Sequence, residues 1–113
     1  MELNVASRSH HDHINVTVAG EIDLYTAPRL HSELAAVIAS AAPASRVTIN
    51  MSGVDFCDST GMNVLLTSLR QATDRGVRFE LAAPRPAVKK ILQVTGLDSV
   101  FTITAEQAAI PGK

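Results

Sequence analysis

A run of small polar residues, Asp58-Ser59-Thr60-Gly61, stands between a strand-like segment and an apolar segment with helical spacing. An Asp or a Ser there would cap the helix by accepting a hydrogen bond from a free backbone N–H group, a contact worth about 1 kcal/mol. Capping explains one of these residues. The second hydroxyl and the glycine are poor helix formers. Their shared small size indicates an open helix end, where another protein could approach Ser59 closely.

The Ser59 hydroxyl has two kinds of chemistry open to it. A hydrolytic nucleophile needs a base within hydrogen-bond reach, and the known strand–turn–helix form of such a site reads G-x-S-x-G. The frame here is C-D-S-T-G. Three of the four histidines lie together at 10–13, and His31 falls on the polar side of a predicted helix. The hydrolytic interpretation is therefore the weaker one, and an open helix end would leave Ser59 accessible to a phosphoryl donor; an esterase-like use of Ser59 remains a further alternative.

Three other groups combine reactive residue types. The segment His10-His11-Asp12-His13 has metal-binding side chains, although adjacent histidines are typical of a solvated turn, which we expect here. The acids Glu21 and Asp23 end a strand, as turn residues often do. Cys57 precedes a helix start, where a thiol pKa can fall, but its apolar surroundings favour a small core residue. No phosphate-binding glycine motif occurs, so we expect no bound cofactor.

Length and composition restrict the class of protein. The 113 residues fit a single domain, 1–113, and 46% hydrophobic with 19% charged residues indicates a globular chain. A net charge of −1 without a long Lys/Arg run argues against a nucleic-acid partner. The apolar segments are too short to span a membrane. With one cysteine and no apolar N-terminal run, we expect a cytoplasmic protein.

Strands and helices alternate along the chain. We predict strands at 3–7, 14–18, 47–51, 77–81 and 101–103, and helices at 28–41, 62–73 and 86–92, with a tail helix opened by Thr104 and Gln107. The segment 52–61 is then a connection that carries the polar cluster. The order β-β-α-β-α-β-α-β-α predicts an α/β fold with a small, mostly parallel (mixed) sheet after an opening hairpin.

Two segments, GEIDLYTAPRL (20–30) and VTINMSGVDFCDSTGMNVLL (47–66), resemble the STAS domain in its single-domain bacterial form, the anti-sigma-factor antagonist. The resemblance covers nearly the whole chain. The pairing of G-E-x-D and A-P-x-L with a later D-S-T-G is what makes it specific. It implies a STAS-like fold, with a small sheet and helices packed mainly on one side.

The resemblance also implies a function. Ser59 corresponds to the serine that is phosphorylated in the family, and Asp23 would lie close to it. The partner would be an anti-sigma factor with a kinase fold, which binds the unmodified antagonist, releases its sigma factor and can phosphorylate Ser59; a phosphatase resets the switch. The predicted partner-binding residues are Asp23, Asp58, Thr60, Gly61 and Asn63.

Three positions depart from the family pattern. Asn50 stands where many relatives have Asp, Cys57 where a larger apolar residue is usual, and Asn63 where Gly is frequent. Asn50 and Asn63 bear on contact with the partner, whereas none of the three removes the acceptor serine. The alternative function is a STAS scaffold or sensor, or a transport-associated subunit, that is not regulated through Ser59.

Overall fold

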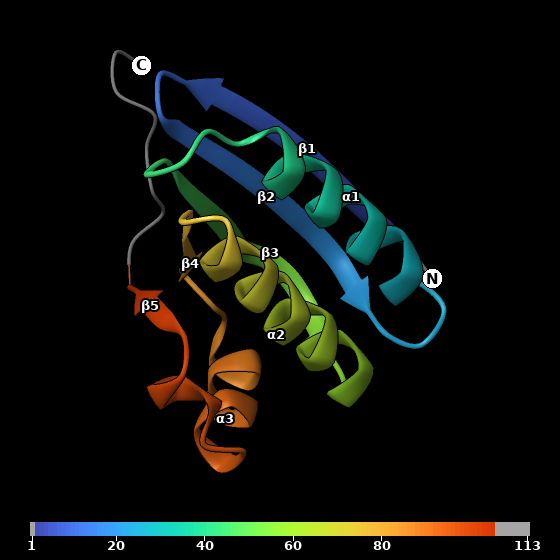
Figure 1. The fold of residues 1–113 in the computed structure, drawn as a ribbon. Coiled ribbons are helices and arrows are strands. Elements are labelled where there is room, and N and C mark those ends of the chain that lie inside the picture. The colour runs from blue at the N-terminus through green and yellow to red at the C-terminus, as the bar shows by residue number, and fades with distance from the viewer. Residues whose placement is uncertain (1, 106–113) are drawn as a thin grey trace.

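The computed structural model describes residues 2–105, in which five strands form one sheet in the order β1-β2-β3-β4-β5 (Figure 1). Strands β1 and β2 are antiparallel, and the other neighbours are parallel. The strands are β1 Leu3–His10, β2 His13–Ile22, β3 Arg46–Cys57, β4 Arg78–Ala82 and β5 Thr102–Thr104. The helices are α1 Ala27–Ser40, α2 Ser59–Asp74 and α3 Pro86–Val94, followed by the 3-10 turn η1 Leu97–Ser99.

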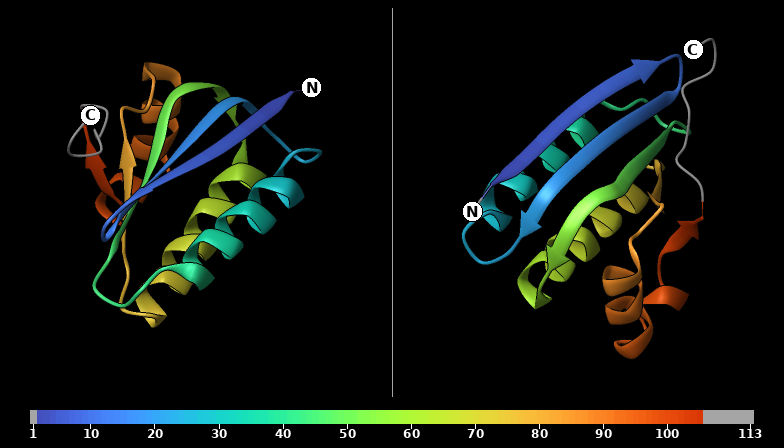
Figure 2. Two further views of the ribbon diagram at one scale, coloured as in Figure 1. Left: turned by 90° about the horizontal axis from the view of Figure 1, so that it is seen from above. Right: turned by 180° about the vertical axis from the view of Figure 1, so that it is seen from behind.

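This arrangement confirms the predicted mixed α/β fold. Helices α1 and α2 lie side by side over one face of the sheet, and α3 lies at its β4–β5 end (Figures 1 and 2). The predicted tail helix falls beyond residue 105 and so outside the described residues.

The core is aliphatic, in keeping with an aromatic content of 4% and the lack of tryptophan in the sequence. Alternate residues of the central strands face α1 and α2, because successive side chains of a strand point to opposite faces. Helix α1 contributes residues four apart, which lie on one face of a helix. The central members of the cluster are Val16, Val18, Ile22, Leu30, Leu34, Ile38, Val47, Ile49, Met51 and Leu65.

Three strands run further than the sequence pattern predicts, and the first of them, β1, continues to His10. Strand β2 continues to Ile22 and β3 to Cys57, so the segment 52–57 is part of a strand rather than a connection. Gly53, a turn signal in the sequence, lies inside β3, where an added Cβ would stand 2.9 Å from the Ala19 Cβ. The glycine therefore allows β2 to approach closely, which is a common reason for glycine in a strand.

The hairpin between β1 and β2 is tighter than predicted. Only His11 and Asp12 form the turn, and His11 has a positive φ of 55°. His13 is buried, and its Nε2 lies 3.0 Å from the Thr48 Oγ1. Burial, followed by the nearby charge of Arg46, lowers the pKa of His13. The expected solvated turn is thus wrong for His13, which belongs to the sheet.

Candidate functional site

The carboxyl ends of β2 and β3 lie next to one another. Ile22 pairs with Cys57 at the last step of the parallel ladder, and the Asp58 N–H donates to the Ile22 carbonyl at 3.1 Å. Asp23 and Asp58 directly follow these two strands, whose arrowheads end at one edge of the sheet (Figure 1). The structure therefore brings both halves of the sequence signature to the same edge, where α/β sheets commonly bind their ligands.

Asp58 is the N-cap of α2. Its Oδ1 accepts a hydrogen bond from the Gly61 N–H at 3.0 Å, and its carbonyl accepts one from the Met62 N–H at 3.0 Å. Both Asp58 and Ser59 were candidates for this role from the sequence. Because Asp58 takes it, the Ser59 hydroxyl is left out of the cap.

Ser59 is the first residue of α2 and is exposed. Within residues 2–105 its hydroxyl has no hydrogen bond to another side chain or to the backbone. The first N–H groups of a helix have no intrahelical acceptor, and the helix dipole favours negative charge at this end. Thr60 is half-buried, and Asn63, one turn further along α2, is exposed. The position can thus accept an anionic group without losing an existing contact.

Gly61 faces the core. A Cβ at this position would stand 2.5 Å from the Ile22 Cγ2 and 2.7 Å from the Cys57 Sγ. Contacts of that length do not occur, so the glycine lets the first turn of α2 pack directly on the ends of β2 and β3. The sequence interpretation linked the small size of Gly61 to an open helix end, whereas the structure requires that small size on the core side; a contact of Gly61 with a partner stays a prediction. Its lack of a side chain allows the first turn of α2, which contains Ser59, to lie directly against the ends of β2 and β3.

Cys57 is fully buried under this turn. Burial, with a smaller contribution from the charge of Asp58, raises the pKa of its thiol to about 12. The expected small core residue is confirmed, and the thiol is protonated at neutral pH, which makes it a poor nucleophile.

Asp23 is a buried turn residue rather than a surface acid. Only 5% of it is exposed. Its Oδ1 accepts hydrogen bonds from the N–H groups of Tyr25 at 2.9 Å and Thr26 at 3.0 Å. The Thr26 hydroxyl accepts from the Asp23 N–H at 2.9 Å and donates to the Glu21 carbonyl at 2.8 Å. This reciprocal pair has the hydrogen bonds of a capping box and closes the turn just before α1, whose N-cap position is Thr26.

Three large apolar side chains at this edge escaped the sequence interpretation. Leu24 and Tyr25 follow Asp23 and are exposed, Tyr25 by 80%, and Phe56 is about half exposed beside Glu21 in the β2–β3 register. Grouped exposed apolar residues often mark a protein-binding surface. The sequence did contain a signal for two of them, because Leu24 and Tyr25 follow the acids Glu21 and Asp23 in a turn, where polar residues are usual.

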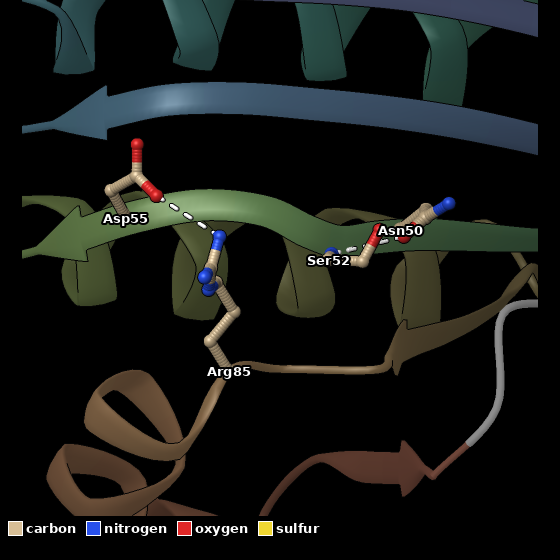
Figure 3. A network of polar contacts seen from close by, with 4 residues as sticks. All are labelled: Asn50, Ser52, Asp55 and Arg85. Atoms are coloured by element: carbon tan, nitrogen blue, oxygen red, sulfur yellow. Dashed lines mark hydrogen bonds and ion pairs between the residues drawn. The ribbon is translucent and has the colours of Figure 1, made fainter.

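Asn50 lies away from this edge. It is buried in the middle of β3, where its Oδ1 accepts a hydrogen bond from the Ser52 N–H at 3.0 Å (Figure 3). Seven residues separate it from Cys57, which corresponds to roughly 20 Å of strand. Figure 3 also shows an exposed ion pair of 3.1 Å between Asp55 and Arg85, which joins the end of β3 to the start of α3. The Asn50 departure is therefore internal to the sheet.

The histidines of the hairpin are far from Ser59. His13 begins β2 and Ile22 ends it, a separation of roughly 30 Å along the strand. In the described part of the chain, no histidine hydrogen-bonds to Ser59, and no three His, Cys, Asp or Glu side chains gather as metal ligands. The same residues include no helix long and apolar enough to cross a bilayer.

Comparisons with known proteins agree with this geometry. The family model described as "Mlab, STAS domain" matches residues 5–104. The chain is 28% identical over 106 residues to the anti-sigma-B factor antagonist of Bacillus subtilis (strain 168), covering 94% of each. A crystal structure of an anti-sigma factor antagonist from Mycobacterium paratuberculosis superimposes with a TM-score of 0.81 at 30% identity, covering 91% of this chain and 86% of that one.

A further structure, the Bacillus cell fate determinant SpoIIAA in its phosphorylated form, has a TM-score of 0.67 at 18% identity, with 90% of each chain covered, and so shares the fold. The family match spans both strand ends that carry Asp23 and Asp58, together with the helix that begins at Ser59. This chain belongs to the STAS domain family.

Proposed function

We propose that this protein is an anti-sigma-factor antagonist whose binding to an anti-sigma factor is switched off by phosphorylation of Ser59. The observation that carries the proposal is the exposed Ser59 hydroxyl at the start of α2, which the Asp58 cap leaves without a hydrogen bond in the described residues. The similarity to named antagonists supports the partner class. That a protein of the same fold exists in a phosphorylated form supports the modification.

Phosphate would change the charge of this edge more than its structure. A phosphoserine carries about −1.5 to −2 charges at neutral pH. The backbone N–H groups and the dipole of α2 tolerate that charge. The carboxylate of Asp58 already lies next to Ser59 in the chain, whereas that of Asp55 is paired with Arg85. An interface complementary to the unmodified edge would be lost through repulsion and bulk, and a loss of about 3 kcal/mol lowers affinity roughly a hundredfold.

The phosphoryl donor has to come from outside this chain, since the sequence contains no nucleotide-binding glycine motif. We assign the donor role to an anti-sigma factor with kinase activity and the resetting role to a phosphatase. The protein itself then acts by binding and has no catalytic step, and the proposed compartment is the cytoplasm, where such partners meet ATP.

The direct test is phosphorylation by the anti-sigma factors of the source organism. Each is incubated with this protein and ATP, and intact mass and peptide mapping locate the phosphate. We expect one phosphate on Ser59, none on the Ser59→Ala variant, and an unchanged yield on the matched control Thr60→Ala. Phosphate at the wild-type level on Ser59→Ala contradicts the assignment.

A second measurement separates the switch from the alternative of a scaffold or transport-associated subunit. Titration calorimetry compares the unmodified and the phosphorylated protein with the same anti-sigma factor. We expect the phosphorylated form to bind roughly a hundredfold more weakly. Equal affinity of the two forms would favour the scaffold.

A further inference from the structure

An apolar groove runs along α2 on the side that faces α3 and η1. It consists of two hollows, of about 270 Å³ and about 370 Å³, which share Leu66 and Leu97 in their walls. We call it the α2–α3 groove and define it by Met62, Leu66, Leu69, Ile91, Leu97 and Val100. The two hollows extend from Ser59 at one end to Thr73 at the other, which corresponds to roughly 20 Å of helix.

The groove gives α2 a second apolar stripe. The first stripe contains Leu65 and Ala72, which are buried in the core. The second contains Met62, Leu66 and Leu69, at positions i, i+4 and i+7, of which Leu66 and Leu69 are only partly buried. A helix at the surface of a globular protein normally has one apolar stripe facing the core. Within the described residues, Met62 is buried in the core, whereas Leu66 and Leu69 pack against the core and leave part of their apolar surface open.

The groove is continuous with the proposed partner-binding site. Three of the predicted site residues, Asp58, Ser59 and Asn63, line its first hollow beside Met62 and Leu66. A partner that contacts Ser59 therefore contacts the mouth of the groove. This continuity indicates what occupies it, because a partner anchored at Ser59 can follow α2 without leaving apolar surface.

We propose that the anti-sigma factor places an amphipathic helix in the α2–α3 groove, with apolar side chains at i, i+4 and i+7 and its end against Ser59. Helix-in-groove recognition uses this spacing, and a groove between two helices accepts a third helix by ordinary side-chain packing. The inference rests on the proposed function and adds how the switch works. The groove supplies the apolar contact area, and Ser59 stands at its mouth.

The groove explains why modification of one hydroxyl has a large effect. An unmodified serine at the mouth is uncharged, so removing it from water when the helix docks costs little free energy. A phosphate there must stay hydrated, because removing an ionised group from water is costly unless it gains a partner. It would therefore exclude an apolar helix end from the mouth, while the rest of the groove stays unchanged.

The test uses three arginine substitutions and calorimetric titration with each purified anti-sigma factor of the source organism. Leu66→Arg places a charge where the two hollows meet, and Val100→Arg places one at the far hollow on a residue already 50% exposed. Val94→Arg is the matched control, because Val94 is 77% exposed and lines neither hollow. We expect losses of about a hundredfold for Leu66→Arg and about tenfold for Val100→Arg, with Val94→Arg within about twofold of the wild type.

The outcomes separate the groove from the switch. If phosphorylation abolishes binding but Leu66→Arg and Val100→Arg bind as the wild type does, the groove proposal is wrong and the switch stands. If no anti-sigma factor binds the wild type, both are wrong. Circular dichroism checks folding, and if Leu66→Arg is unfolded, Val100→Arg decides.

Self-association is measured on the same samples. A wild-type dimer that Val100→Arg converts to a monomer, with the affinity for the anti-sigma factor unchanged, would show that a second copy of the chain occupies the groove. That result overturns the proposal. A monomeric wild type, with partner affinity lost only in the groove variants, supports it.

Discussion

The two strand-to-helix junctions near Ser59 each contain an aspartate, but the two aspartates have different roles. Each begins with an aspartate that follows a parallel strand: Asp23 accepts two backbone N–H groups in the turn before α1, and Asp58 caps α2. At the β2–α1 junction, Asp23 is buried, and the nearby hydroxyl of Thr26 is bonded in both directions. At the β3–α2 junction, the cap Asp58 is half-exposed, and the nearby hydroxyl of Ser59 makes no hydrogen bond within the described residues. The first junction is built for stability, and the second leaves one reactive group free.

The largest effect on stability is expected at the first junction. Asp23→Ala removes the acceptor for two backbone N–H groups inside a buried loop. We expect the free energy of unfolding to fall by about 3 kcal/mol, since buried donors are left without partners. Urea denaturation measures this. The sequence placed Asp23 at a strand end, where truncation would cost little stability; its burial in the loop changes that expectation.

Asp23→Asn is the matched control for that prediction, because it keeps a side-chain oxygen in place and changes the charge. A loss for Asp23→Ala no greater than that for Asp23→Asn would show that the hydrogen bonds of the loop carry little of its stability. The contrast between the two junctions would then fail.

Gly61 gives the next largest effect, because it decides how closely the second junction packs. Gly61→Ala puts a methyl group where Ile22 and Cys57 already stand, at 2.5 Å and 2.7 Å. Overpacking of this kind costs about 2 kcal/mol and should displace the first turn of α2. Thermal unfolding measures the cost, and Thr60→Ala, a truncation in the same turn, controls for it. An unchanged midpoint for Gly61→Ala would mean that α2 moves freely over the sheet edge.

His13 begins β2, at the other end of this strand from Asp23. It allows the comparison to be tested through the dependence of stability on pH. Burial lowers the pKa of His13, so the folded state binds its proton less readily than the unfolded chain. Arg46 acts in the same direction, while Glu80, Asp12 and His10 have smaller effects of mixed sign. Stability is therefore complete above the unfolded pKa of about 6.5 and falls as the pH drops below it.

The measurement is urea denaturation at pH 7.5 and 5.5, with His13→Gln beside the wild type. We expect the wild type to lose more stability on acidification than the variant does. An equal loss in both proteins would place the acid-sensitive group elsewhere in the chain.

The smallest expected effects on stability distinguish the capping role of Asp58 from the proposed switch role of Ser59 at the β3–α2 junction. Asp58→Ala should cost about 1 kcal/mol of unfolding free energy, the usual value for a lost N-cap. Ser59→Ala should change it by less than about 0.5 kcal/mol, because the hydroxyl makes no bond in the described structure. Chemical denaturation of both variants checks this. A larger loss for Ser59→Ala than for Asp58→Ala would return the capping role to Ser59.

Much of the fold follows from local patterns in the sequence. The alternation of Val47, Ile49 and Met51 predicts the central strand, and the spacing of Leu30, Leu34 and Ile38 predicts the helix over it. The residues at which β2 and β3 end could not be predicted from local patterns. The pairing of Ile22 with Cys57 joins residues 35 positions apart, and it outweighs the local turn signals of Gly20 and Gly53.

The candidate site divides in the same way. Residue type and spacing were enough to select Asp58 and Ser59, because a cap and a helix start are local features. They were not enough to orient Asp23 and Gly61. Whether those residues face solvent or the core depends on where α1 and α2 pack, and that is decided by the whole sheet.

The hydrogen bond from the Asp58 N–H to the Ile22 carbonyl has a consequence for dynamics. It extends the β-ladder into the cap residue itself, so the Asp58 amide can exchange its hydrogen with solvent only when the sheet edge opens. The next amide, that of Ser59, has no such acceptor at a helix start. Exchange protection is therefore expected to drop between two consecutive residues, and the proposed modification of Ser59 would need no local unfolding.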